Sequence, residues 1–159
     1  LQDPIYPFTD EKWGEARRLK SASMLIGLLL AWPVAALAAD DVIAIGQWRT
    51  EPGKALVCGG TEGEALVDIA THANAFYESG AKSGSAEYEA YWSRLERAFK
   101  ERRCFVTAKM RHLPDSLVYA GPKTLEAQGK RFKVVGTTIE EDGERYPAFT
   151  MTTLKVKKP

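Results

Sequence analysis

The residues best suited to proton transfer or metal binding in this sequence are its two histidines. His72 follows Asp68 by four positions in a pattern that predicts a helix, so the two side chains share one helical face. Such a pair can bind a metal ion or act as a base with its orienting carboxylate. A metal site needs three or four ligands, and no others follow at a recognisable spacing, so we predict a solvated surface pair. For His112, which precedes a predicted turn, we also expect a simple surface role.

Nucleophilic and acid–base chemistry have weaker signals still. The G-x-S-x-G motif is missing, and the carboxylates Glu140, Glu141 and Asp142 fall on a predicted hairpin tip, where a solvated turn is expected. We therefore predict no catalytic residue, no metal site and no cofactor. An acid–base pair assembled only in three dimensions remains the alternative, because such a pair needs spatial rather than sequence proximity.

The segment 17–41 has the pattern of a secretory leader. Basic residues precede an apolar run that is shorter than the about 20 residues of a membrane span, and Ala36-Leu37-Ala38 ends it in an A-x-A arrangement. We interpret residues 1–38 as an upstream extension plus a signal peptide, cleaved after Ala38 or after Ala39. Residues 39–159 then form a single exported domain, periplasmic or secreted. The alternative is an uncleaved leader that anchors the domain at the inner membrane.

The two cysteines, Cys58 and Cys104, are 46 positions apart. In an oxidising compartment they are expected to pair, and the bond would stabilise the domain by about 4 kcal/mol in the chain-entropy model. A metal pair or a reactive thiol are the alternatives, but neither has a supporting C-x-x-C spacing or a nearby histidine in the sequence.

Charge is nearly balanced, with a net value of +1, which gives no indication of a nucleic-acid partner. The densest basic stretch runs from Arg94 to His112. It is interpreted as the outer face of a helix, with contact to anionic envelope polymers or lipid headgroups as the alternative. The residues of this possible anion-contact patch are Arg97, Arg102, Arg103, Lys109 and Arg111.

Two amphipathic helices are expected in the middle of the chain. Thr61 and Glu64 have the spacing of a capping box, and the apolar pattern behind them predicts a helix to about Glu78. Ser85 is the predicted N-cap of a second helix that ends near Arg102. If the helices are antiparallel, both cysteines lie at the same end of the hairpin.

The rest of the chain favours strands. We predict strands or extended segments in residues 42–50, 54–58, 104–110, 115–121, 131–141 and 144–154. Pro114 predicts a turn or a bend, Asp142-Gly143 a hairpin, and Pro147 an edge strand or a bulge. The tail from Lys155 is expected to be frayed.

These elements predict an α+β fold, with an antiparallel helical hairpin packed on a small antiparallel sheet or an SH3-like partial barrel. A leader, a cysteine before the hairpin, "RRCFV" after it and a β-rich tail together resemble small exported bacterial proteins of uncharacterised families. The resemblance implies architecture only. We expect a non-enzymatic binding or structural module of the cell envelope that binds an unknown envelope protein or polymer at a sheet edge near Tyr146 to Met151. A small periplasmic hydrolase or an enzyme inhibitor is the alternative.

Overall fold

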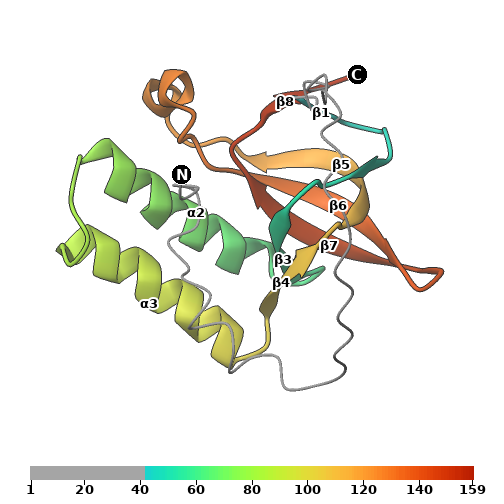
Figure 1. The fold of residues 1–159 in the computed structure, drawn as a ribbon, viewed down its shortest axis with the longest axis horizontal. Helices are drawn as coiled ribbons and strands as arrows, with labels where there is room; N and C mark the ends of the chain where they lie inside the picture. Colours follow the sequence, from blue (N-terminus) through green and yellow to red (C-terminus); the bar gives the residue numbers. More distant parts are fainter. Residues whose placement is uncertain (1–41) are drawn as a thin grey trace, which may run out of the picture. The chain divides into compact units, whose positions relative to one another are not determined.

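A computed structural model describes residues 42–159, and the predicted leader lies outside this range. Two helices pack against a six-stranded antiparallel sheet, which confirms the α+β class and the sheet alternative (Figure 1). The sheet has the order β2-β5-β6-β7-β3-β4, and β1 and β8 form a separate parallel pair. The strands are β1 (Val42–Ala44), β2 (Arg49–Thr50), β3 (Lys54–Gly59), β4 (Cys104–Ala108), β5 (Arg111–Tyr119), β6 (Lys133–Glu141), β7 (Glu144–Thr152) and β8 (Lys155–Lys157).

The first helix, α2 (Gly63–Glu78), ends where the sequence predicted but does not begin with the predicted capping box. Its N-cap is Glu62, and no side chain caps it, so the role assigned to Thr61 is wrong. Packing against the sheet determines this start. A Cβ atom on Gly63 would lie 2.8 Å from the ring of Phe149, so only glycine lets the helix begin this close to β7.

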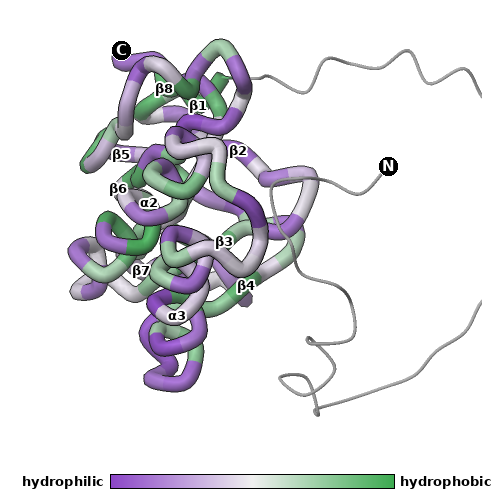
Figure 2. Tube along the Cα trace, turned by 90° about the vertical axis from the view of Figure 1, so that its left-hand side faces the viewer, coloured by the Kyte–Doolittle hydropathy of each residue, from purple (hydrophilic) through white to green (hydrophobic). Residues whose placement is uncertain are grey.

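The second helix, α3 (Ala86–Lys100), begins as predicted. Ser85 is its N-cap, and the hydroxyl of Ser85 accepts a hydrogen bond from the backbone N–H of Tyr88 at 3.2 Å. Tyr91, Leu95 and Ala98 form its buried stripe. Figure 2 shows the resulting alternation of hydrophobic and hydrophilic residues along α3. In Figure 1 the two helices lie side by side, and α2 is the helix next to the sheet.

The β6–β7 hairpin turns at Asp142-Gly143, as predicted. Both residues have positive φ, 51° and 82°, which suits a two-residue hairpin turn. Pro114, in contrast, lies inside β5, so the turn predicted to separate two strands at this point is wrong. The register between β5 and β6 shifts between Pro114 and Ser116, and this irregularity accommodates the missing N–H of proline within a paired strand.

The position of β7 corrects two further expectations. Residues 144–152 pair with β6 along their whole length, and residues 148–150 also pair with β3. Most of the segment from Tyr146 to Met151 is therefore internal, and only its first two residues lie beyond the end of β3. Pro147 lies just beyond the end of β3, where β7 has one neighbour only, and β6–β7 pairing there has no bulge. The C-terminal tail is not frayed throughout, because Lys155–Lys157 pairs with Val42–Ala44 as β8.

Both faces of the sheet are covered. Val134 and Val135 are neighbours on β6, so their side chains point to opposite faces, and both are fully buried. One face packs against α2. The other forms a separate apolar cluster: Ala55, Val57, Met110, Ile139 and Ala148 with Tyr146.

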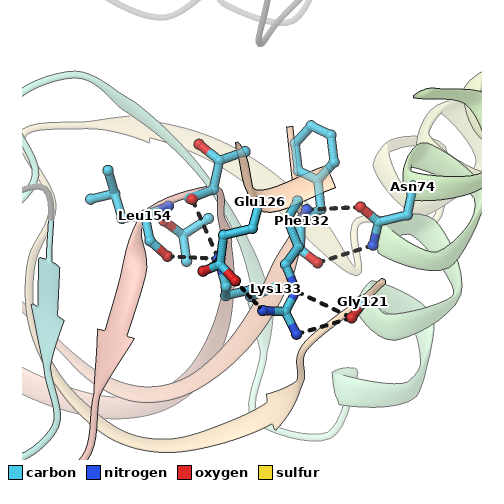
Figure 3. A network of polar contacts seen from close by, with 9 residues as sticks. Asn74, Gly121, Glu126, Phe132, Lys133 and Leu154 are labelled. Carbon is cyan, nitrogen blue, oxygen red and sulfur yellow. Dashed lines mark hydrogen bonds and ion pairs between the residues drawn. The ribbon is translucent and has the colours of Figure 1, made fainter. Parts of the chain in front are cut away.

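Asn74 ties α2 to the start of β6. Its side chain is 1% exposed and pairs with the backbone of Phe132 in both directions. The Asn74 Nδ2 donates to the carbonyl of Phe132 at 3.0 Å, and the N–H of Phe132 donates to Oδ1 at 2.8 Å (Figure 3). These two bonds mimic a strand pairing, so they fix the position of the helix along the sheet.

Two buried cations, Arg131 and Lys133, flank Phe132 in the sequence. Arg131 donates to the carbonyl of Gly121, at 3.1 and 3.2 Å, and to the carboxylate of Glu126 (Figure 3). Lys133, which is 3% exposed, donates to the carbonyls of Thr153 and Leu154. Burial lowers the pKa of Lys133, while the nearby carboxylate of Glu126 opposes that shift. The network holds the short helix η1 (Lys123–Gln128) and the segment before β8 against β6.

Within residues 42–159, no helix has the length and apolar character required to cross a bilayer.

Candidate functional site

Strand β4 is one outer strand of the six-stranded sheet and pairs only with β3 among the described residues. The N–H of Gly59 donates to the carbonyl of Arg103, and the N–H of Lys109 donates to the carbonyl of Gly53. Hydrogen-bonded positions alternate in an antiparallel pair, so the N–H and C=O groups of Phe105 and Thr107 face β3. The groups that face away from β3 belong to Cys104, Val106 and Ala108. They form a free backbone edge within the described fold.

The predicted disulfide between Cys58 and Cys104 is present and fixes the beginning of this edge. The two residues are directly opposite each other in β3 and β4, and their Cα atoms are 4.0 Å apart. That separation is characteristic of the close, non-hydrogen-bonded pair of an antiparallel ladder. The bond therefore attaches β4 covalently to β3, its one neighbouring strand within residues 42–159. It lies in the sheet itself, beside the helical hairpin.

The five cations of the predicted anion-contact patch form two groups. Arg97 lies in the last turn of α3, and Arg102 and Arg103 lie between α3 and β4. Lys109 and Arg111 lie beyond the other end of β4. Since a strand rises about 3.3 Å per residue, the six positions from Arg103 to Lys109 correspond to about 20 Å. The sequence cluster is thus divided between the two ends of the free edge.

An exposed aromatic ring lies between these two basic ends. Phe105 is 41% exposed, one of two large apolar side chains on the described surface with such exposure. Its partner across the ladder, Val57, is fully buried. In the part of the chain that the structure describes, no strand lies beyond β4 to cover the outer side of the Phe105 ring.

His112 is not a surface residue, contrary to the sequence prediction. Its side chain is fully buried on β5, with Thr137 on one side and Glu51 on the other. Nε2 lies 2.9 Å from Oε1 of Glu51, and Nδ1 lies 2.9 Å from Oγ1 of Thr137. A carboxylate only accepts hydrogen bonds, so Nε2 donates to Glu51, and in neutral His112 the hydroxyl of Thr137 donates to Nδ1.

The chain of Glu51, His112 and Thr137 has the residue types of a catalytic relay, but a substrate cannot reach it. Both His112 and Thr137 are at most 1% exposed, so no substrate reaches the hydroxyl or the ring. Arg49 completes the chain through an ion pair to Glu51, at 2.9 Å, and donates to the carbonyl of Val42. The arrangement joins β2 and β1 to the core of the sheet, and its role is structural.

Replacing Glu51 by glutamine is expected to lower the free energy of unfolding by about 2 kcal/mol at pH 7. The amide oxygen of glutamine can still accept a hydrogen bond from His112, but it lacks the charge that pairs with Arg49 and strengthens that bond. Burial alone would raise the pKa of Glu51, but the hydrogen bond from His112 and the charge of Arg49 outweigh burial and hold the pKa below 4.5. A depressed folded-state pKa contributes stability above the unfolded value, and that contribution disappears as the pH falls through the folded pKa.

Urea unfolding of the wild type and the Glu51→Gln variant between pH 2.5 and pH 7 measures this difference. The difference in the free energy of unfolding between the two proteins should be constant near neutral pH, and it should decrease as the pH falls below about 4.5. Glu96→Gln, at an exposed position of α3, is the matched control and should show no gap. A Glu51→Gln gap that persists unchanged at the lowest pH would contradict the assignment.

The pair of Asp68 and His72 lies on the surface of α2, as predicted. Nδ1 of His72 is 3.3 Å from Oδ1 of Asp68, and Nε of Arg94 on α3 is 2.8 Å from Oδ2. Residues 42–159 contain no group of three or more potential metal ligands. The carboxylate of Asp68 connects the two helices at their surface.

The structure shows a row of charged side chains across three strands that the sequence did not predict. Glu140 on β6 lies between Arg111 on β5 and Arg145 on β7 and forms an ion pair with each. Both guanidinium groups lie over the ring of Trp48, each 4.9 Å from its centre. Arg111 is therefore compensated by a carboxylate and packed on an aromatic ring, while Lys109 has no ion pair among the described residues.

The free edge was also missed, because an edge is defined by pairing between distant strands. The only sequence signal for it is the pair of cations that flank the strand, since charged residues are frequent at sheet edges. Comparison with protein-family models, with curated proteins and with solved structures gave no match. The class defined by the fold and the site is an α+β domain with a disulfide-anchored free edge strand.

Proposed function

We propose that this chain is an exported, non-enzymatic binding module of the bacterial cell envelope that accepts an extended segment of a partner protein at β4. The observation that carries the proposal is the free backbone edge of Cys104, Val106 and Ala108. Strand addition uses such groups for affinity and neighbouring side chains for specificity. The disulfide keeps this recognition strand in place while a partner binds.

The location in the envelope rests on two further features. The leader pattern in residues 17–41 is typical of a secretory signal peptide, and a disulfide between Cys58 and Cys104 persists in an oxidising compartment. A periplasmic or secreted module fits both. The chain of Glu51, His112 and Thr137 is buried at its histidine and threonine, and the carboxylate of the exposed Asp68–His72 pair is bound to Arg94. The hydrolase alternative therefore has no comparable support.

The Val106→Pro variant tests this function. Proline removes the N–H of Val106, which faces away from β3, and adds ring atoms at the free edge. We expect the variant to fold, because the hydrogen bonds to β3 come from Arg103, Phe105, Thr107 and Lys109 and not from Val106. We expect binding of an extended peptide to be abolished. The probe is the peptide Gln-Thr-Thr-Val-Ile-Thr-Gln at millimolar concentration, followed by amide shifts in NMR spectra.

Thr107→Pro is the matched variant. Its N–H faces β3, so this change should destabilise the pairing of β3 with β4, whereas Val106→Pro should not. Amide exchange in the free protein gives an independent check, since Val106 and Ala108 should exchange faster than Phe105 and Thr107. Equal binding by the wild type and Val106→Pro, or peptide shifts centred on another strand, would contradict the proposal.

A further inference from the structure

The side chains along β4 alternate in a way that puts both basic ends and the exposed ring on one face. Arg103, Phe105, Thr107 and Lys109 occupy every second position, and the hydrogen bonds of Arg103 and Lys109 to β3 extend the register to both. Since alternate residues of a strand share a face, a partner strand would meet all four side chains on the same side.

The charge on this face is unequal at the two ends. Lys109 has no ion pair within residues 42–159, and its φ of 56° marks the point where the chain turns away from the edge. Arg103 is in contact with Glu62, at 3.5 Å, and with Glu101, at 2.8 Å, and its side chain remains 32% exposed. The adjacent Arg102 has no ion pair in the described part of the chain. A partner therefore meets a net positive charge, most of it at Lys109.

A second copy of this chain is a poor occupant of the edge. Antiparallel pairing of two β4 strands about Val106 would set Arg103 of one copy directly opposite Lys109 of the other, and this contact would occur twice. Like charges directly opposite each other in a sheet are destabilising. The edge is thus suited to a different chain whose charge is opposite.

We propose that the segment accepted at β4 is an acidic, antiparallel strand with carboxylates six positions apart and an apolar side chain between them. One carboxylate lies opposite Lys109 and the other opposite Arg103. The apolar side chain lies opposite Phe105, in a non-hydrogen-bonded pair where side chains are closest, and covers the exposed ring. This inference rests on the proposed function, because it names the partner class of the same site.

The proposed pairing of the partner strand with β4 defines which peptide positions lie opposite which residues. Numbered from its N-terminus, position 1 lies opposite Lys109, position 4 opposite Val106, position 5 opposite Phe105 and position 7 opposite Arg103. The peptide Glu-Thr-Thr-Val-Ile-Thr-Glu meets every requirement. The matched peptides carry glutamine or lysine at positions 1 and 7, and a fourth peptide keeps both glutamates but has proline at position 4, which removes the N–H that pairs with Val106.

The experiment is an NMR titration of the full chain, with its disulfide formed, by each of the four peptides at 50 mM and 300 mM salt. We expect the glutamate peptide to bind up to about fivefold more tightly per charged end than the glutamine peptide, and the lysine peptide to bind weakest. The advantage should shrink at high salt, because these charges are exposed. The proline peptide should not bind.

Two variants assign the charge effect to residues. Lys109→Asn keeps a residue that tolerates positive φ and should remove most of the preference for the glutamate peptide over the glutamine peptide. Arg103→Gln should have a smaller effect, because two carboxylates of the domain already compensate Arg103. Arg97→Gln on α3 lies outside the register of β4 and should leave the preference unchanged.

The outcomes separate the inference from the function on which it rests. Equal affinity for the glutamate, glutamine and lysine peptides, with loss of binding in Val106→Pro, overturns the charge inference and leaves strand addition intact. Binding of the proline peptide as tightly as the glutamate peptide overturns both, because it reveals electrostatic attraction without strand pairing. If the wild type were a dimer and the Val106→Pro variant a monomer, a second copy would be the occupant of the edge. That result would also overturn the inference.

Discussion

Replacement of both Cys58 and Cys104 by alanine is expected to lower the free energy of unfolding by about 4 kcal/mol. The disulfide closes a loop with a sequence separation of 46, and such a cross-link restricts the unfolded chain by about this amount in the chain-entropy model. The effect is large because a domain of this size has a total stability of about 5–15 kcal/mol. Urea unfolding followed by circular dichroism measures the difference.

The tertiary position of the bond adds a local prediction. The disulfide joins β4 to β3 at one end only, so the double variant should lose protection of the amides of Phe105 and Thr107 before the rest of the sheet opens. The double variant with and without reductant is the control, since reductant should not change its stability. A variant within 1 kcal/mol of the oxidised wild type would show that the bond contributes little to stability.

The second large effect is expected at Gly121. Its φ is +62°, and a Cβ atom there would lie 2.4 Å from Nδ2 of Asn74 and 2.8 Å from the carbonyl oxygen of Phe132. Gly121→Ala therefore disrupts the two hydrogen bonds between Asn74 and the backbone of Phe132 in a fully buried site. Loss of buried hydrogen-bond partners costs about 1–3 kcal/mol each, and the backbone conformation adds about 1 kcal/mol, so we expect a loss of about 4 kcal/mol.

Gly129→Ala is a closely matched control. Gly129 has a φ of +65°, but an added Cβ atom would meet nothing within 4 Å. This variant should cost only about 1 kcal/mol, which isolates the backbone contribution. The difference between the two variants in thermal and urea unfolding measures the collision with Asn74. Equal losses in Gly121→Ala and Gly129→Ala would show that the contact of Asn74 with Phe132 contributes nothing measurable.

The local elements of the fold were predictable because their signals lie within a few residues. The serine that caps α3 and the Asp142-Gly143 turn act through backbone geometry at their own positions, and both predictions are confirmed. The periodicity of apolar residues gave the two helices and most strands, since it records which face is buried. The cysteine pairing followed from the helical hairpin between Cys58 and Cys104, together with the redox argument.

Contacts between distant segments overrode other local signals. Thr61 has capping chemistry, but the fit of Gly63 against Phe149 places the start of α2 beyond it. Pro114 resembles a turn residue, but the irregular pairing of β5 with β6 accommodates it. In both cases packing against a partner far away in the chain outweighs a preference of about 1 kcal/mol.

The sequence by itself determined the class of fold, the helices, the main hairpin and the disulfide, because each depends on short-range patterns or on two residues alone. Only the tertiary structure decided that His112 is buried beside Glu51, that β7 is internal and that β4 carries the free edge. Strand order in a sheet depends on which distant segments pair. A single strand contains little information about its neighbours, so the free edge of β4 emerges only when all six strands are assembled.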